Sequence, residues 1–152
     1  MLDVAFFIEI AQQQGYGMRQ AQRVLSQITA QLRSRCNSNG FGMPIAYYIF
    51  RTGGEGGEGG EGGGGSGRPR ILLAFPSADA ALGFAQINHL GTAPRLIQLS
   101  IARLLAILIQ RPAIPALLFA DEPEESFTVN TLPQGLRLER STLLDLLKEE
   151  NV

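Results

Sequence analysis

The sequence contains few of the side chains that enzymes most often use for chemistry. Its 152 residues include one cysteine, one histidine and no tryptophan. The single Cys36 excludes a disulfide framework and a cysteine-rich zinc site. His89 has neither a second histidine nor a nearby acidic residue in the chain, which argues against a metal site or a catalytic triad built on it. We therefore expect no catalytic residues, no metal and no cofactor.

The sequence also has no large excess of charge of either sign and no long apolar run. The 13 basic and 14 acidic residues leave a net charge of −1, without the basic face that binding to a phosphate backbone requires. The start of the chain has no basic region of the kind that begins a signal peptide. The longest apolar stretch, 101–110, is interrupted by Arg103 and is too short to span a bilayer. These features predict a soluble, cytoplasmic protein that binds neither nucleic acid nor membranes.

What is present is the composition of a globular chain, 45% hydrophobic, and we expect a single domain over residues 1–152. Residues 4–14 favour a helix, and from Met18 the apolar residues recur every three or four positions as far as Arg35, which predicts a second, amphipathic helix. Ser77 is typical of the residue that caps the start of a helix.

The remaining pattern alternates between β-rich and helical segments, and it predicts an α/β (α+β) fold. The expected order is two N-terminal helices followed by β-β-α-β-α-β-β-α, which favours a mixed central sheet of about four to five strands with helices on both faces. The closing helix, 141–150, is expected to be capped by Ser141 or Thr142. The expected strands are 44–52, 68–76, 95–100, 115–123 and 136–140, and the other expected helices are 77–91 and 101–111.

A glycine-rich stretch, 53–67, separates the first two expected strands. It holds 11 glycines, three glutamates and one serine, a composition that stays solvated and disordered. Its glutamates and the lack of a phosphate-loop motif argue against a phosphate-binding loop. Strands 44–52 and 68–76 are expected to form a hairpin, or to be neighbours in one sheet. The stretch is therefore a tether inside one domain, and both a natural loop and an engineered splice remain open for it.

Three further features could carry chemistry, and each has a simpler structural explanation. Ser77 follows a strand, but the G-x-S-x-G motif of a nucleophile elbow is absent, and helix capping accounts for it. Cys36 follows Arg35 at a helix end, where an incidental thiol is expected. The acidic run 121–125 is either a solvated loop or an acidic edge for a basic peptide, and its carboxylates are Asp121, Glu122, Glu124 and Glu125.

Aromatic and sulfur side chains beside glycines give the candidate partner-binding residues. Tyr16 lies between Gly15 and Gly17, and Phe41 and Met43 flank Gly42. With Tyr47, these side chains are expected to line a peptide groove or an exposed strand edge, although Tyr47 is also expected among the aromatic residues of the core. The alternative is that the aromatic rings plug the edge of the sheet.

Three segments of the chain resemble a known family. RPRILLAFPSADAALGFAQ, RLIQLSIARLLAILIQRPAIPALLFADEP and LPQGLRLERSTLLDLL are together similar to the CcmS-type carboxysome assembly chaperones of cyanobacteria. The resemblance covers most of the chain outside 52–67 and rests on overall pattern, so no residue role is carried over. It implies a cytosolic, non-enzymatic chaperone that binds the C-terminal tail of a carboxysome shell protein.

These observations favour a non-enzymatic protein-binding module, an adaptor or assembly chaperone that captures a peptide tail or a partner surface. One alternative is a small-ligand-binding or enzymatic domain in which Asp121 or Glu122 converges on Arg95. Another alternative is a structural subunit of a homo-oligomer.

Overall fold

Five helices and five strands occupy the described part of the chain, in the order that the sequence predicts. The structure, a computed structural model, describes residues 2–38, 44, 46–50, 71–88, 95–121, 127 and 132–148. The helices are α1 (Leu2–Gln13), α2 (Met18–Ser38), α3 (Ala78–Ile87), α4 (Ile101–Gln110) and α5 (Arg140–Lys148). The strands are β1 (Tyr47–Phe50), β2 (Leu72–Ala74), β3 (Leu96–Leu99), β4 (Ala116–Ala120) and β5 (Gly135–Glu139).

The helices form where apolar residues recur at helical spacing. In α2, four residues that step by three or four positions, Ala21, Val24, Ile28 and Leu32, are all buried. The break before α2 is made by Gly15, whose φ of 94° lies in the left-handed region that favours glycine. The expectation of two N-terminal helices is therefore confirmed.

The strands form two small sheets, so the expectation of one central sheet of four to five strands is wrong. β1 pairs antiparallel with β3, while β4 lies between β2, to which it is parallel, and β5, to which it is antiparallel. The expected pairing of segments 44–52 and 68–76 is reduced to one antiparallel bridge within the described residues, because β1 and β2 each take their ladder partner from a later part of the chain. The two sheets meet at Tyr48 and Phe75, which exchange two N–H···O bonds of 2.8 Å.

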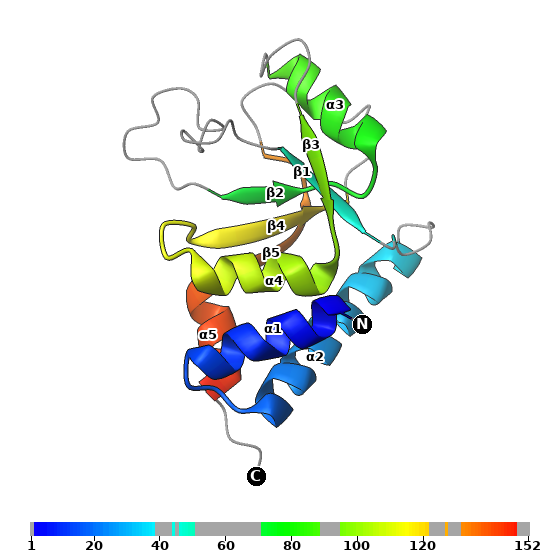
Figure 1. The fold of residues 1–152 in the computed structure, drawn as a ribbon. Coiled ribbons are helices and arrows are strands. Elements are labelled where there is room, and N and C mark those ends of the chain that lie inside the picture. Colours follow the sequence, from blue (N-terminus) through cyan, green and yellow to red (C-terminus); the bar gives the residue numbers. More distant parts are fainter. Residues whose placement is uncertain are drawn as a thin grey trace.

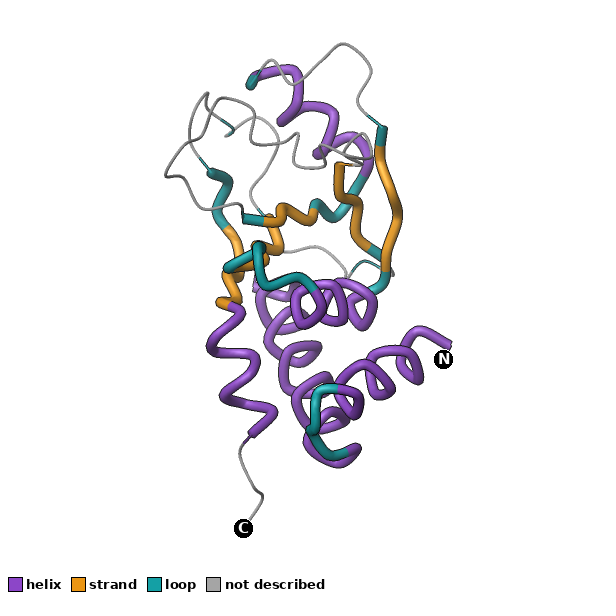
Figure 2. The backbone as a smooth tube through the Cα atoms, turned by 60° about the vertical axis from the view of Figure 1, so that its left-hand side comes forward, coloured by secondary structure: helices purple, strands orange, loops and turns teal. Residues whose placement is uncertain are grey.

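The strands lie between one layer of four helices and a single helix on the other side. Figure 1 shows α1, α2, α4 and α5 below the strands and α3 above them, with β1 and β3 running steeply across the direction of β2 and β4. Figure 2 shows the same separation of the helices after the view is turned. Helices therefore cover both sides of the strands, although the strands belong to two sheets.

Alternation along β1 divides the interior into two cores. Tyr47 and Ile49 belong to the larger core, which the strands share with the four-helix layer, whereas Tyr48 and Phe50 pack against the smaller one. The smaller core is aromatic and lies against α3. Its buried residues are Phe75, Ala80, Ala81, Phe84, Ala120 and Phe127.

The closing helix begins earlier than the sequence predicts. α5 starts at Arg140, directly after β5, so Ser141 and Thr142 lie inside its first turn and neither is its cap. The reason is that the Arg140 N–H donates to the Pro115 carbonyl at 2.7 Å, which extends the ladder between β4 and β5 into the start of the helix.

None of the helices within the described ranges combines the length and the apolar character that crossing a bilayer requires. The same residues contain no cluster of three or more histidine, cysteine, aspartate or glutamate side chains able to hold a metal ion.

Candidate functional site: the open edge of strand β3

The two sheets have four end strands, β1 and β3 in one and β2 and β5 in the other, and the outer edges of β3 and β5 face no other described strand. Among the described strands, β3 has only β1 as a neighbour, and β5 has only β4. β1 and β2, in contrast, approach each other at the bridge between Tyr48 and Phe75. An end strand presents a row of N–H and C=O groups to whatever can pair with it, so these two edges are where the fold can add a strand.

The bridge at Tyr48 fixes which groups of β3 point outward. In an antiparallel ladder a residue directs its N–H and C=O to the same side, and successive residues alternate. Tyr48 bonds to Phe75, so its groups point away from β3, and its ladder partner Gln98 must likewise point away from β1. By alternation Ile97 bonds to β1, whereas Leu96 and Gln98 offer their N–H and C=O groups at the outer edge.

The two edges differ in the charge of their side chains. β5 carries an exposed ion pair, in which Arg137 Nε lies 2.7 Å from Glu139 Oε2 and the two side chains are 45% and 44% exposed. Charges of this kind protect an edge strand from pairing with another chain. β3 carries no charged residue between Leu96 and Leu99, and its one exposed residue is the neutral Gln98. β3 is therefore the edge better suited to pairing.

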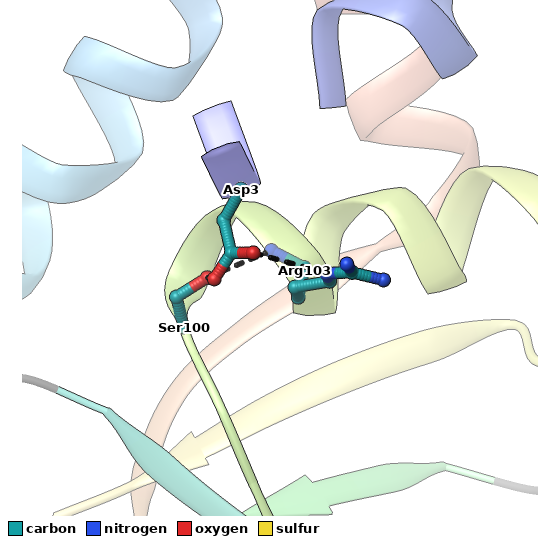
Figure 3. Close-up of polar contacts among 3 residues, drawn as sticks. All are labelled: Asp3, Ser100 and Arg103. Carbon is teal, nitrogen blue, oxygen red and sulfur yellow. Dashed lines mark hydrogen bonds and ion pairs between the residues drawn. The ribbon is translucent and has the colours of Figure 1, made fainter. Parts of the chain in front are cut away.

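The end of β3 is fixed in place by a polar cluster that joins α1 to α4. Ser100 follows β3 and caps α4, because its Oγ accepts from the Arg103 N–H at 3.2 Å. The same hydroxyl donates to Asp3 Oδ2 at 2.7 Å, and Arg103 Nε donates to Asp3 Oδ1 at 3.1 Å. Figure 3 shows Asp3 reaching from the start of α1 to both residues. The direction in which β3 leaves the strand layer is thus set by three side chains.

Electrostatics reinforce this anchor. The hydrogen bonds from Ser100 and Arg103 lower the pKa of Asp3 below its usual value, so the carboxylate stays charged at neutral pH. The Arg103 guanidinium also lies over the Phe6 ring, 4.2 Å from the ring centroid. Arg103 therefore holds α1 through both its charge and its contact with an aromatic ring.

Two of the four candidate partner-binding residues, Tyr16 and Tyr47, are described, and they lie in different elements. Tyr47 is 2% exposed and its ring meets Phe119 edge-on at 5.1 Å, so it is a core residue. Tyr16 lies in the turn between α1 and α2, half-buried against the larger core. Figures 1 and 2 show that turn at the far end of the helix layer, away from β1 in the strand layer. Phe41 and Met43 lie outside the described residues.

The acidic edge is described only at its first residue. Asp121, at the end of β4, accepts from Arg35 Nε of α2 at 2.6 Å, and its side chain is 13% exposed. The charge of Asp121 is therefore paired with a residue of α2. Arg95, on which Asp121 was expected to converge, is an exposed residue directly before β3. The residues Glu122, Glu124 and Glu125 lie outside the described part of the chain, as do His89 and residues 53–67.

Two of the remaining candidates have structural roles. Ser77 Oγ accepts from the Ala80 N–H at 3.1 Å, which confirms it as the cap of α3. Cys36 is 4% exposed in α2, and burial raises the pKa of its thiol, so the reactive thiolate is disfavoured there. Burial likewise raises the pKa of Tyr47 well above its usual value.

Sequence reasoning did not single out Leu96 and Gln98, whose backbone groups lie at the outer edge of β3. The segment LIQL was recognised as a strand, but its edge could not be assigned without knowledge of its partner β1, about 50 positions earlier in the chain. The only signal in the sequence was the absence of charge from these four residues.

Comparisons with known proteins add no relative. No family model, no curated protein and no solved structure matches the chain. The resemblance to CcmS-type chaperones stays a prediction from the sequence pattern, and the open edge of β3 is the feature on which a functional proposal can be built.

Proposed function

We propose that this protein is a protein-binding module that captures an extended segment of a partner protein by adding it as a strand to the outer edge of β3. The observation that carries the proposal is the outward direction of the N–H and C=O groups of Leu96 and Gln98. Backbone groups provide affinity in this mode of recognition, and alternate side chains of the segment provide specificity.

The properties of β3 restrict the segment that fits. It must be extended over at least the length of β3 and must have free N–H groups opposite Leu96 and Gln98, so proline is excluded at those positions. Alternate side chains of the segment would lie beside Ile97 on one face and beside Gln98 on the other. The resemblance noted above adds one specific candidate, the C-terminal tail of a carboxysome shell protein.

The direct test is capture from a native extract with three forms of the protein as bait. Gln98→Pro removes one outward N–H without removing a bond of the β1 ladder, and Gln98→Ala, the matched control, keeps that N–H and changes only the exposed side chain. We expect a partner that is retained by the wild type and by Gln98→Ala and is lost with Gln98→Pro.

The captured protein is then cut into overlapping peptides, and the binding segment is titrated against the three forms. A segment that binds all three forms with equal affinity contradicts the proposal, as does the absence of any protein that distinguishes Gln98→Pro from the wild type. A second variant, Gln98→Lys, places a charge on the edge and is expected to weaken binding without the backbone constraint of proline.

A further inference from the structure

The outer edge of β3 is complementary to itself. If two copies lie antiparallel with Ile97 opposite Ile97, Leu96 of each copy faces Gln98 of the other. Each of these two facing pairs exchanges two N–H···O bonds, so every outward N–H and C=O of both strands is used. We propose that two copies of this chain pair through β3 in this register, joining their two-stranded sheets into one sheet of the order β1-β3-β3-β1.

Neighbouring two-fold registers leave groups without a partner. Centring the pair on Leu96 would place Gln98 opposite Pro94, which has no N–H to donate. Centring it on Gln98 would place Leu96 opposite Ser100, whose carbonyl already accepts from the Leu104 N–H at 3.0 Å. In the register centred on Ile97, every outward N–H and C=O group of β3 pairs with a residue of the other β3 strand.

The charges at the ends of β3 are compatible with this arrangement. Arg95, which precedes β3, would lie opposite Leu99 of the other copy, so the two Arg95 side chains stay at opposite ends of the paired strands. At the other end of β3, Asp3 and Arg103 are already paired with each other at 3.1 Å. Like charges directly opposite each other would destabilise a strand pair, and this register avoids them.

Self-pairing would regulate the proposed function, because a partner segment must displace the second copy from the same edge. The inference rests on the proposed function in this respect alone. Four backbone hydrogen bonds make a small interface, so the dimer is expected to dissociate on dilution. A partner segment would then bind the monomer and shift the equilibrium away from the dimer.

The register is tested by disulfide trapping in a Cys36→Ala background. Ile97 faces its own copy as a non-hydrogen-bonded pair, in which Cα atoms are about 4.5 Å apart, within reach of a disulfide. We expect Ile97→Cys to form a cross-linked dimer in a glutathione redox buffer at least about tenfold faster than Leu99→Cys. Leu99 is a matched control from the same face of β3, and Leu99 of one copy lies opposite Arg95 rather than Leu99. Equal rates, or no dimer from Ile97→Cys, would overturn the proposed register.

Sedimentation of the protein without introduced cysteines provides the second measurement. The wild-type mass is expected to rise with concentration from 16.4 kDa toward twice that value, whereas Gln98→Pro stays at 16.4 kDa. A wild type that remains monomeric at every concentration overturns the inference. If Gln98→Pro nevertheless loses the captured partner, the proposed function stands. If the dimer forms but all three baits capture the same proteins, the proposed function fails and the inference stands.

Discussion

At the scale of single residues, Asp3 connects parts of the molecule that are far apart in the sequence. It accepts from Ser100, which ends β3, and from Arg103, in the first turn of α4. Both bonds favour the ionised carboxylate, which is why the pKa of Asp3 is lowered. The stabilising effect of this charge must therefore depend on pH.

Replacing Asp3 with asparagine tests that dependence. A carboxyl whose pKa is lower in the folded state stabilises the fold above its unfolded pKa, about 3.9, and loses this effect as pH falls through the folded value. At pH 7 we expect Asp3→Asn to lower the free energy of unfolding by less than about 1 kcal/mol, because the Asp3 side chain is 40% exposed and water screens the pair.

The measurement is urea unfolding of both proteins at pH values from about 7 down to about 2. The difference between wild type and Asp3→Asn should shrink toward zero at the acid end. A difference that stays constant over this range would show that the charge of Asp3 has no role in stability.

Residue roles were predictable from the sequence where a local pattern determined them. Ser77 was identified as a cap because the chain around it contains both the strand end and the helix start. Tyr47 was expected both in the core and near a groove, because the sequence alone does not reveal which face of β1 meets Phe119. The pairing of Asp121 with Arg35 joins β4 to α2 across 86 positions, a distance at which a single sequence holds no pairing signal.

At the scale of elements, the caps of α3 and α4 are similar in geometry but differ in their connections. In each helix a serine Oγ accepts from the N–H three positions later, at 3.1 Å for Ser77 and 3.2 Å for Ser100. Ser100 also donates to Asp3 and so joins α4 to α1. The two serines can therefore be compared directly, because both cap a helix but Ser100 also bonds to a second helix.

We expect Ser77→Ala to cost about 1 kcal/mol of stability, the usual effect of losing a helix cap. Ser100→Ala should cost roughly 1 kcal/mol more, because the hydrogen bond to a charged carboxylate is lost as well. Thermal or urea unfolding of the two variants measures the difference. Equal losses would mean that the contact with Asp3 contributes nothing beyond the cap.

The elements themselves were largely predictable, whereas their pairing was not. The periodic pattern of α2 correctly selects the buried Val24, Ile28 and Leu32, although it begins at Met18, which is 48% exposed. β1 and β2 were expected to pair because they follow each other in the chain. Each instead pairs with a strand that lies beyond α3, and no residue in a short strand of three or four positions specifies such a partner.

At the scale of the whole molecule, strands from two sheets separate two cores of unequal size. The four helices α1, α2, α4 and α5 cover one side, and α3 with its aromatic cluster covers the other. Of the four end strands of the two sheets, β1 and β2 approach each other at the bridge between Tyr48 and Phe75, while the outer edges of β3 and β5 face no other described strand. An exposed ion pair protects the edge of β5 from pairing. The proposed function and the proposed dimer both follow from the uncharged edge of β3.

The central claim is that Leu96 and Gln98 direct their backbone groups outward. It is tested most directly by amide hydrogen exchange in β3, measured by nuclear magnetic resonance on dilute protein without a partner. Ile97 and Leu99, which bond to β1, should exchange slowly, while Leu96 and Gln98 exchange faster and slow down as the protein concentration rises. Slow exchange at Leu96 and Gln98 in dilute protein, equal to that at Ile97 and Leu99, would contradict the account.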